Sequence, residues 1–243
     1  MRIAMIASGS RGDVQPYIAL GKGLADAGHL VRILTHDNYE KSVRSYGLDF
    51  HRLKGNPQEV AESEEMLKLL EKGNFLAINA YTSKIVKEAT QHWAKDGLVA
   101  CRDAELLIAG VGGLFVAFAL AERLNIPLPQ AYVFPFTPTR DFPAALVPKS
   151  VAQFGGGANR LSHQLFRQIM WQGSRGADKL VRQNVLNLPV APFFGPYNSP
   201  RFQQLPPLYG FSPSVIPQPS DWQNAKVTGY WFLDASSDWV PPK

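Results

Sequence analysis

The first 35 residues constrain the fold of this chain more than any other stretch. The run Ile3–Ala7 is apolar throughout, without the polar alternation of a half-buried strand, which is typical of a buried parallel strand. A loop with two glycines follows, and Pro16–Ala27 has the apolar spacing of a helix, with proline suited to its first turn. Leu30–Thr35 supplies a second strand. Such a strand–loop–helix–strand unit carries its chemistry at the carboxyl end of the first strand.

Strand and helix signals continue to alternate as far as residue 134. Further strands are expected at Leu48–Leu53, Asp103–Ala109 and Pro127–Phe134. Helices are expected at Asn38–Tyr46, within Pro57–Lys72, at Phe75–Ala100 and at Leu114–Leu124. This alternation predicts an α/β fold, a Rossmann-like doubly wound parallel sheet with helices on both faces.

The composition changes after Phe134. The loop Phe134–Pro143 is rich in aromatic residues and proline and cannot join a central strand. Gly155–Gly157 is expected to be a flexible break, followed by a long helix at Asn159–Asn187. The expected core positions of that helix are Leu161, Leu165, Ile169, Leu180 and Val185.

The last part of the chain is rich in proline. Leu188–Pro219 contains nine prolines, which predict irregular surface chain. The last two strands are expected within Pro206–Phe211 and Lys226–Thr228. We expect residues 1–233 to form one domain and the polar residues 234–243 to begin an interdomain linker.

The formal net charge is +5, and the excess of positive charge is local. Between residues 142 and 220 seven basic residues stand against a single acid, Asp178, whereas residues 1–120 contain 14 of each sign. This basic region suits an anionic partner such as a phosphate or a membrane surface; a solvated helix face is the alternative.

The cysteine content and the apolar runs favour a cytoplasmic protein. The basic region adds the expectation of peripheral contact with a membrane. Cys101 is the one cysteine, so an internal disulfide framework is excluded and a reducing compartment is favoured. The opening apolar run is too short for a signal peptide. The longest apolar run, Leu106–Ala121, has 16 residues and contains three glycines, whereas a membrane-spanning helix needs about 20.

Three loops are expected to line a crevice at the carboxyl edge of the sheet: Ser8–Gln15, Gly110–Leu114 and Val133–Phe142. The first loop offers backbone N–H groups, Ser10, Arg11 and the carboxylate of Asp13. The second offers Gly112 and Gly113, which allow close approach of a ligand. The third offers Phe134, Phe136 and Phe142, which suit an apolar or ring-shaped ligand.

Asp13 has two interpretations of equal weight. A carboxylate facing an apolar pocket is the arrangement that takes a proton from a hydroxyl as its oxygen attacks. The alternative is an acid that caps the following helix, worth roughly 0.5–2 kcal/mol.

A dinucleotide site is the competing interpretation of the same loop. It would need the pattern G-x-G-x-x-G, and Gly9–Gly12 provides only G-x-x-G. Asp37 stands where a ribose-binding acid would, but Asp13 would repel a pyrophosphate at the helix N-terminus. The five histidines show no metal-ligand spacing, no G-x-S-x-G elbow is present, and only local charge favours nucleic acid, so metal and nucleic-acid partners are not expected.

The run Gly9–Gly21, GSRGDVQPYIALG, resembles the opening motif of family 28 glycosyltransferases, a group that includes sterol glucosyltransferases and glycopeptide-antibiotic glycosyltransferases. The loop Phe136–Pro143 and the closing stretch from Val227 to Pro242 are similar to the sterol glucosyltransferase branch in particular. The resemblance extends over the whole chain. It implies the N-terminal half of a GT-B fold, in which this domain binds the acceptor and a C-terminal domain binds a UDP-sugar.

The resemblance also implies the roles of individual residues. Asp13 would be the base that deprotonates the acceptor hydroxyl, acting directly because no histidine stands near it in sequence, unlike in plant-type relatives. The loop Gly9, Ser10, Arg11 and Gly12 would lie near the donor phosphates. The acceptor side would be lined by Phe136, Thr137, Arg140 and Phe142.

The function expected from the resemblance is the acceptor-binding half of an inverting hexosyltransferase. It would move glucose from UDP-glucose to a hydroxyl of a sterol-like or other lipidic acceptor, with the UDP-sugar as co-substrate and no cofactor or metal. No donor half follows within residues 1–243, so this chain alone is expected to have no measurable glycosyl transfer. The alternative is a Rossmann-like nucleotide-binding module or an NAD-dependent oxidoreductase domain.

Overall fold

A parallel sheet runs through the protein and is built in two parts. The computed structural model describes residues 1–55, 63–71, 75–145 and 147–233. The first part contains β1 (Arg2–Ile6), β2 (Leu30–Thr35), β3 (Asp49–Arg52) and β4 (Leu106–Ala109) in the order β3-β2-β1-β4. The second contains β5 (Ala131–Tyr132), β6 (Leu208–Tyr209) and β7 (Lys226–Val227) in that order. All pairs are parallel, and a parallel bridge between Ala109 and Gln130 joins the two parts.

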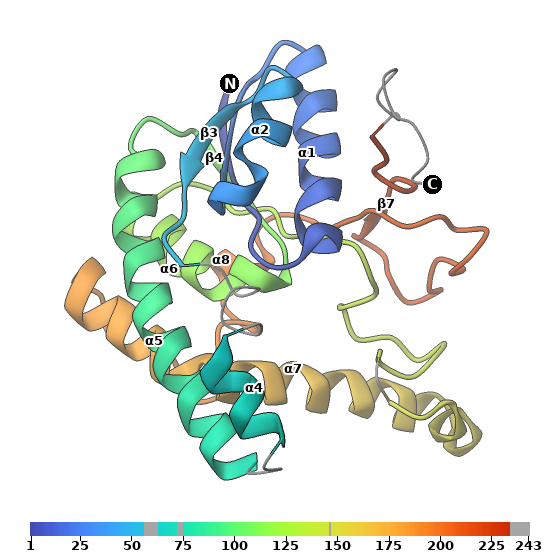
Figure 1. The fold of residues 1–243 in the computed structure, drawn as a ribbon. Coiled ribbons are helices and arrows are strands. Elements are labelled where there is room, and N and C mark those ends of the chain that lie inside the picture. The colour runs from blue at the N-terminus through green and yellow to red at the C-terminus, as the bar shows by residue number, and fades with distance from the viewer. Residues whose placement is uncertain (56–62, 72–74, 146, 234–243) are drawn as a thin grey trace, which may run out of the picture.

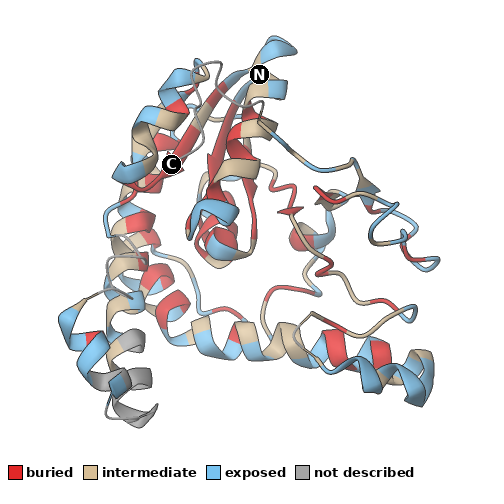
Figure 2. Cartoon of the chain, turned by 45° about the vertical axis from the view of Figure 1, so that its right-hand side comes forward, coloured by how far each residue is buried: buried red, intermediate tan, exposed pale blue. Residues whose placement is uncertain are grey.

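Alternate residues of β1 face opposite layers of helices, because successive side chains of a strand point to opposite faces. Ile3 and Met5 belong to the core shared with α1 (Arg11–Asp26) and α2 (Glu40–Ser45). Ala4 and Ile6 belong to the core shared with α5 (Phe75–Ala100) and α6 (Leu114–Leu124). β1, β2 and β4 are largely buried (Figure 2). The predicted doubly wound α/β fold is therefore confirmed.

A long helix, α7 (Gly155–Leu180), packs against α5 and lies below the sheet (Figure 1). The shorter helical elements are α4 (Glu64–Glu71), α8 (Pro200–Gln203), the 3₁₀ turns η1 (Asp37–Tyr39), η2 (Val111–Gly113) and η3 (Lys149–Phe154), and the π-helical turn η4 (Val181–Leu186). No helix in the described ranges is long and apolar enough to cross a bilayer.

The first helix begins at Arg11, five residues before the predicted start at Pro16. The cause is the pair Ser10 and Asp13, which caps the helix at residue 10. Pro16 then lies in the second turn, where its missing N–H costs one helical hydrogen bond. The helix predicted at Asn38–Tyr46 is divided into η1 and α2.

The region around α7 differs most from expectation. Gly155–Gly157 is the first turn of the helix rather than a flexible break, because Gly156 packs against Arg140. The predicted core residues Leu161, Leu165 and Ile169 are 53%, 55% and 71% exposed.

The buried face of α7 is polar at its N-terminal end, because it satisfies the hydrogen bonds of the loop at residues 140–144. Ser162 Oγ accepts from the backbone N–H of Ala144 at 2.9 Å, and Asn159 donates to the carbonyl of Arg140 at 2.9 Å. His163 Nε2 lies 3.1 Å from the carbonyl oxygen of Phe142. Buried backbone groups need such partners, so polar side chains occupy the positions that apolar spacing had assigned to solvent.

Several strands are shorter than predicted, because only the residues that pair with a neighbouring strand are included. β5, β6 and β7 are each two residues long. The predicted linker at 234–243 and the first part of the helical region Pro57–Lys72 lie outside the described residues. Cys101 is buried, and burial raises the pKa of its thiol to about 12, as a structural cysteine requires.

The turn Gly110–Gly113 approaches the end of β1 so closely that side chains would not fit. A Cβ atom at Gly112 or Gly113 would overlap the Ser8 carbonyl oxygen or the Ile6 side chain. A Cβ at Gly110 would overlap the hydroxyl of Tyr17, which donates to the carbonyl of Ala131. Gly112 and Gly113 are therefore required by the contact of this turn with the end of β1, and Gly110 by the contact with Tyr17 and β5.

We expect Gly110→Ala to lower the free energy of unfolding by about 1–3 kcal/mol, because the added methyl displaces the buried Tyr17 hydroxyl. Urea unfolding measures the change. Gly23→Ala is the matched control, since a Cβ at this exposed position of α1 meets nothing within 4 Å. The control should be neutral or stabilising by up to ~1 kcal/mol. Equal stability of the two variants would contradict the packing role.

Candidate functional site

A cavity of about 460 Å³ opens beyond the carboxyl ends of β1 and β4, where residues of the three loops predicted to line a crevice meet α5 and α7. Its walls are mostly apolar. The apolar wall residues are Ile85, Val86, Ala89, Trp93, Val111, Leu114, Phe115, Val116, Phe134, Met170, Ala177 and Val181. Ser8, Gly9, Asp13, Gly55, Thr90, Gly112, Gly113, Ser174 and Asp178 complete the lining. Ligand cavities typically have volumes of about 300–1,000 Å³ and a few polar groups among apolar walls.

Asp13 lies in the first turn of α1 and lines this cavity. Its Oδ2 accepts hydrogen bonds from the backbone N–H and the hydroxyl of Ser10, both at 2.8 Å. Among the described residues, Oδ1 has no hydrogen-bond partner. Gly9 adopts φ +136°, and a Cβ there would lie 2.5 Å from Asp13 Oδ2. The loop therefore holds the carboxylate through one oxygen, Oδ2.

A buried pair at residues 8 and 36 lies beside Asp13. Ser8 Oγ is 3.0 Å from His36 Nε2, and His36 Nδ1 is 3.3 Å from the carbonyl oxygen of Leu53. The His36 ring packs against Trp93, a wall of the cavity, with centroids 5.6 Å apart. Donation from Nδ1 to Leu53 leaves Nε2 to accept the Ser8 hydroxyl, which fixes both side chains.

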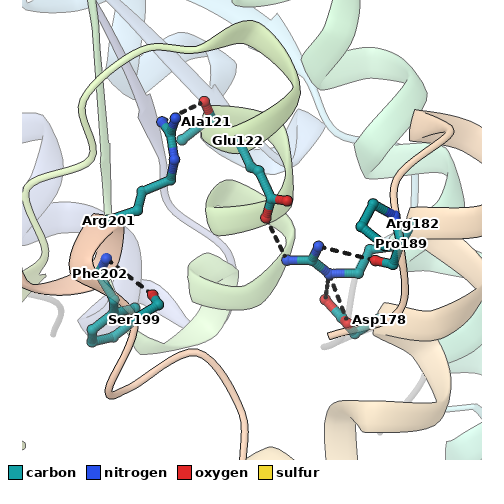
Figure 3. Close-up of polar contacts among 8 residues, drawn as sticks. All are labelled: Ala121, Glu122, Asp178, Arg182, Pro189, Ser199, Arg201 and Phe202. Carbon is teal, nitrogen blue, oxygen red and sulfur yellow. Dashed lines mark hydrogen bonds and ion pairs between the residues drawn. The ribbon is translucent and has the colours of Figure 1, made fainter. Parts of the chain in front are cut away.

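An ion-pair cluster lies at the α7 wall of the cavity (Figure 3). The Arg182 guanidinium lies 3.1 Å from Asp178 Oδ2 and 2.9 Å from Glu122 Oε2, and donates to the carbonyl of Pro189 at 3.3 Å. Arg182 and Asp178 are almost fully buried. Burial raises the pKa of Asp178 to about 6, although the charge of Arg182 opposes that increase. This cluster joins α6, α7 and η4 behind the apolar wall.

The structure brings together five of the predicted site residues. Asp13, Gly9, Gly112, Gly113 and Phe134 all line the cavity.

Three other predicted residues stand next to Asp13 but outside the lining. Ser10 bonds to Asp13, Gly12 is exposed, and exposed Arg11 donates to Gln15 at 2.8 Å.

The four remaining predicted residues lie away from this cavity. Phe136 is only 1% exposed and packs in the core against Tyr132 and Phe166. Thr137 exchanges hydrogen bonds with the Tyr209 hydroxyl at 2.8 and 2.6 Å. The backbone of Arg140 bonds to Asp221 and Asn159, and that of Phe142 to His163. Their loop folds over α7, so the structure assigns it a packing role and leaves its acceptor contact as a prediction.

Sequence reasoning missed the walls that α5 and α7 supply. The helical spacing of Ile85, Ala89 and Trp93 is typical of a helix face that packs in a core, and in the structure these residues face the cavity. Nothing in the sequence separates these two cases, because both need apolar side chains at the same spacing. Asp178 carried a signal, as the only acid in the basic region.

The structure does not support the competing interpretation of a dinucleotide site, because the candidate ribose-binding acid is already paired. Asp37, the candidate ribose-binding acid, pairs with Arg52 at 2.7 Å. In the described ranges, no group of three His, Cys, Asp or Glu side chains is arranged to hold a metal ion.

Fold and cavity together define a class. A doubly wound parallel sheet with an apolar cavity and a loop carboxylate at its carboxyl edge corresponds to the N-terminal half of a GT-B glycosyltransferase. The glycotransferase of kitacinnamycin is similar in structure, with a TM-score of 0.54 and 16% sequence identity over 99% of this chain and 55% of that protein. The spinosyn forosaminyltransferase SpnP has a TM-score of 0.54 and 12% identity, covering 100% of this chain and 54% of that one. At these identities the likeness concerns the fold.

The sequence identifies the family. The N-terminal domain of glycosyltransferase family 28 matches residues 3–143, so the chain belongs to this family. Among its relatives, a sterol 3-beta-glucosyltransferase of Emericella nidulans is 37% identical over 254 residues. One of Komagataella phaffii is 37% identical over 249 residues. Both alignments cover the whole of this chain, which spans 17% and 19% of those relatives' lengths.

The raised pKa of Asp178 predicts a pH-dependent contribution to stability. A carboxyl with a folded-state pKa of about 6 and an unfolded value of about 3.9 stabilises the fold below pH 4, and this contribution is lost as the pH rises through 6. We expect the wild-type free energy of unfolding to fall by ~2–3 kcal/mol more than that of Asp178→Asn between pH 4 and 7.

Urea unfolding of both proteins at pH 4, 5, 6 and 7 measures this difference, and other titrating groups cancel in the comparison. A difference that does not change with pH would contradict the raised pKa.

Proposed function

We propose that this chain is the acceptor-binding half of an inverting glycosyltransferase that moves a hexose to the hydroxyl of a sterol-like lipid. The observation that supports this most directly is the position of Asp13, whose carboxylate stands at the edge of a largely apolar cavity of about 460 Å³. A rigid apolar alcohol would bury its rings between α5 and α7. Its hydroxyl would then lie at the polar end, formed by Asp13, Ser8 and Gly112.

The carboxylate has the geometry of a general base. Ser10 occupies Oδ2 and fixes the orientation of the side chain, so Oδ1 accepts the proton from the acceptor hydroxyl. The acceptor oxygen attacks the anomeric carbon of the sugar, and the nucleoside diphosphate leaves from the opposite side with the bonding electrons. Inversion at the sugar carbon follows from this single displacement.

The donor is a UDP-sugar, with UDP-glucose as our proposal, and a second domain would bind it. The names of the relatives in Emericella nidulans and Komagataella phaffii support glucose and sterol as the substrates. The chain alone is expected to bind acceptor without transferring sugar, and no metal or further cofactor is required by the displacement.

Contact with an anionic membrane remains a proposal that the surface of α7 supports. Leu161, Leu165 and Ile169 form an exposed apolar stripe on this helix, with Phe193 and Phe194 exposed on the neighbouring loop. The surrounding region carries seven basic residues and one acid. Such a surface suits the lipid phase in which a sterol is dissolved.

The alternative function, a nucleotide-binding module, predicts different ligands. The Asp13 carboxylate occupies the N-terminus of α1, where a dinucleotide needs positive potential. Titration of the 243-residue chain with NAD and with UDP-glucose separates the two functions, and tight binding of NAD would favour the alternative.

We expect Asp13→Asn, in a longer chain that includes a donor-binding domain, to lower kcat by about 10²–10⁴-fold with little change in the acceptor KM. Asparagine keeps an oxygen for the Ser10 hydrogen bonds and loses the basic carboxylate. Steady-state transfer from UDP-glucose to a sterol measures both constants. Asp26→Asn, at an exposed acid of the same helix that pairs with Lys22, is the control. An unchanged kcat would leave Asp13 with the capping role alone.

We expect Ala89→Phe to weaken acceptor binding by about tenfold or more, because the phenyl group fills the cavity from the α5 wall. Titration of the 243-residue chain with a fluorescent sterol that keeps its hydroxyl measures the affinity. Val99→Phe is the control, since Val99 is 69% exposed on the same helix and lies outside the cavity. Equal affinities of the two variants would place the acceptor elsewhere.

A further inference from the structure

A second cavity, of about 480 Å³, shares no lining residue with the acceptor cavity. Arg167 of α7 forms one wall, and Lys226, at the start of β7, lies at the mouth. None of the lining residues is an acid. The proposed function does not use this cavity.

Arg167 is held in an aromatic cage. Its guanidinium carbon lies 4.5 Å from the ring centre of Tyr197, 5.2 Å from that of Phe136 and 6.0 Å from that of Phe202. The Tyr197 hydroxyl also donates to the backbone carbonyl of Arg167 at 2.9 Å. Helix, loop and rings therefore fix the position of this cation.

The guanidinium of Arg167 makes no hydrogen bond or ion pair with any described side chain, and its Nε is buried without a partner. Arg182, which is 2% exposed, pairs instead with both Asp178 and Glu122. Asp178 is the only acid between residues 142 and 220, so the single local counterion belongs to Arg182.

Neighbouring acids do not compensate the charge of Arg167 either. Asp221 accepts hydrogen bonds from the Thr139 hydroxyl and the backbone of Arg140, and Asp141 accepts from Ser220. Rings stabilise the faces of a guanidinium but do not satisfy its N–H groups. A half-buried guanidinium with an unpaired, buried Nε at a cavity wall is complementary to an anion.

We propose that this cavity binds the phosphate monoester of a small organic molecule. A phosphate monoester carries a charge of about −1.5 to −2 at neutral pH, which matches the two cations Arg167 and Lys226. Its three terminal oxygens accept from the guanidinium. Gln204, Gln223 and Asn224 line the exposed side, and their amide groups make no hydrogen bond with the described residues. The volume exceeds that of a bare phosphate, and the rest of the molecule packs on Tyr197, Leu205 and Pro206.

Isothermal titration of the 243-residue chain with phenyl phosphate at low ionic strength tests the site. We expect Arg167→Gln to weaken binding by about tenfold or more and Lys226→Gln by about threefold or more. Arg160→Gln, at an exposed arginine of the same helix outside the cavity, should bind within about twofold of wild type. Arg167→Lys keeps the charge and loses the fork of donors, so it should also weaken binding.

Circular dichroism checks that each variant folds. If Arg167→Gln does not fold, Lys226→Gln at the exposed mouth gives the decisive comparison with Arg160→Gln. The proposal is overturned if wild type shows no binding, if benzoate binds as well as phenyl phosphate, or if Lys226→Gln and Arg167→Lys bind like wild type.

Vesicles that contain phosphatidic acid identify the source of the phosphate. If Arg167→Lys weakens vesicle binding in parallel with phenyl phosphate binding, the site takes a lipid headgroup. If only phenyl phosphate binding weakens, the site takes a soluble phosphate monoester. Failure of this site leaves the proposed transferase function intact, because the two cavities have separate walls and separate ligands.

Discussion

The hydrogen bond from the Tyr17 hydroxyl to the carbonyl of Ala131 connects the first helix to the second part of the sheet. The backbones of the two parts are joined by the bridge from Ala109 to Gln130, and β4 is also bonded through Leu107 to Pro127, ahead of β5. Burial raises the pKa of Tyr17 far above its usual range, so the hydroxyl remains a donor. The bond exists only because Gly110 leaves space for that hydroxyl, and the same close approach positions the glycine turn over Ser8. The position of the glycine turn at the cavity therefore depends on the packing of Gly110 against the Tyr17 hydroxyl.

The two interpretations of Asp13 are compatible. One carboxylate oxygen accepts from Ser10 and starts α1, which explains why this helix begins before Pro16. The other oxygen has no partner among the described residues and belongs to a side chain that lines the cavity. Capping fixes the orientation of the carboxylate, and orientation is what a general base requires. A stabilising contact and a catalytic position can therefore come from one residue.

The sequence predicted the sheet well because its strands are uninterrupted apolar runs, which are typical of parallel strands covered on both faces. The bounds of β2, α5 and α6 agree with the predicted ones. The cavity was predicted at its three loops, from which Gly9, Asp13, Gly112, Gly113 and Phe134 line it. The walls from α5 and α7 were not predicted, because apolar spacing does not distinguish a residue that faces a cavity from one in a filled core.

The face of α7 was predicted wrongly for a related reason. Hydrophobic spacing predicts the buried face of a helix from the apolar side chains alone. The buried face of α7 instead carries Ser162 and Asn159, because their side chains form hydrogen bonds with backbone groups of the loop at residues 140–144. Leu161, Leu165 and Ile169 are left on the surface in consequence. Charge shows the same limit. The composition shows seven basic residues against one acid in this region, whereas the structure shows which of them is paired. Asp178 pairs with Arg182, and the buried Nε atoms of Arg167 and Arg175 have no partner among the described residues.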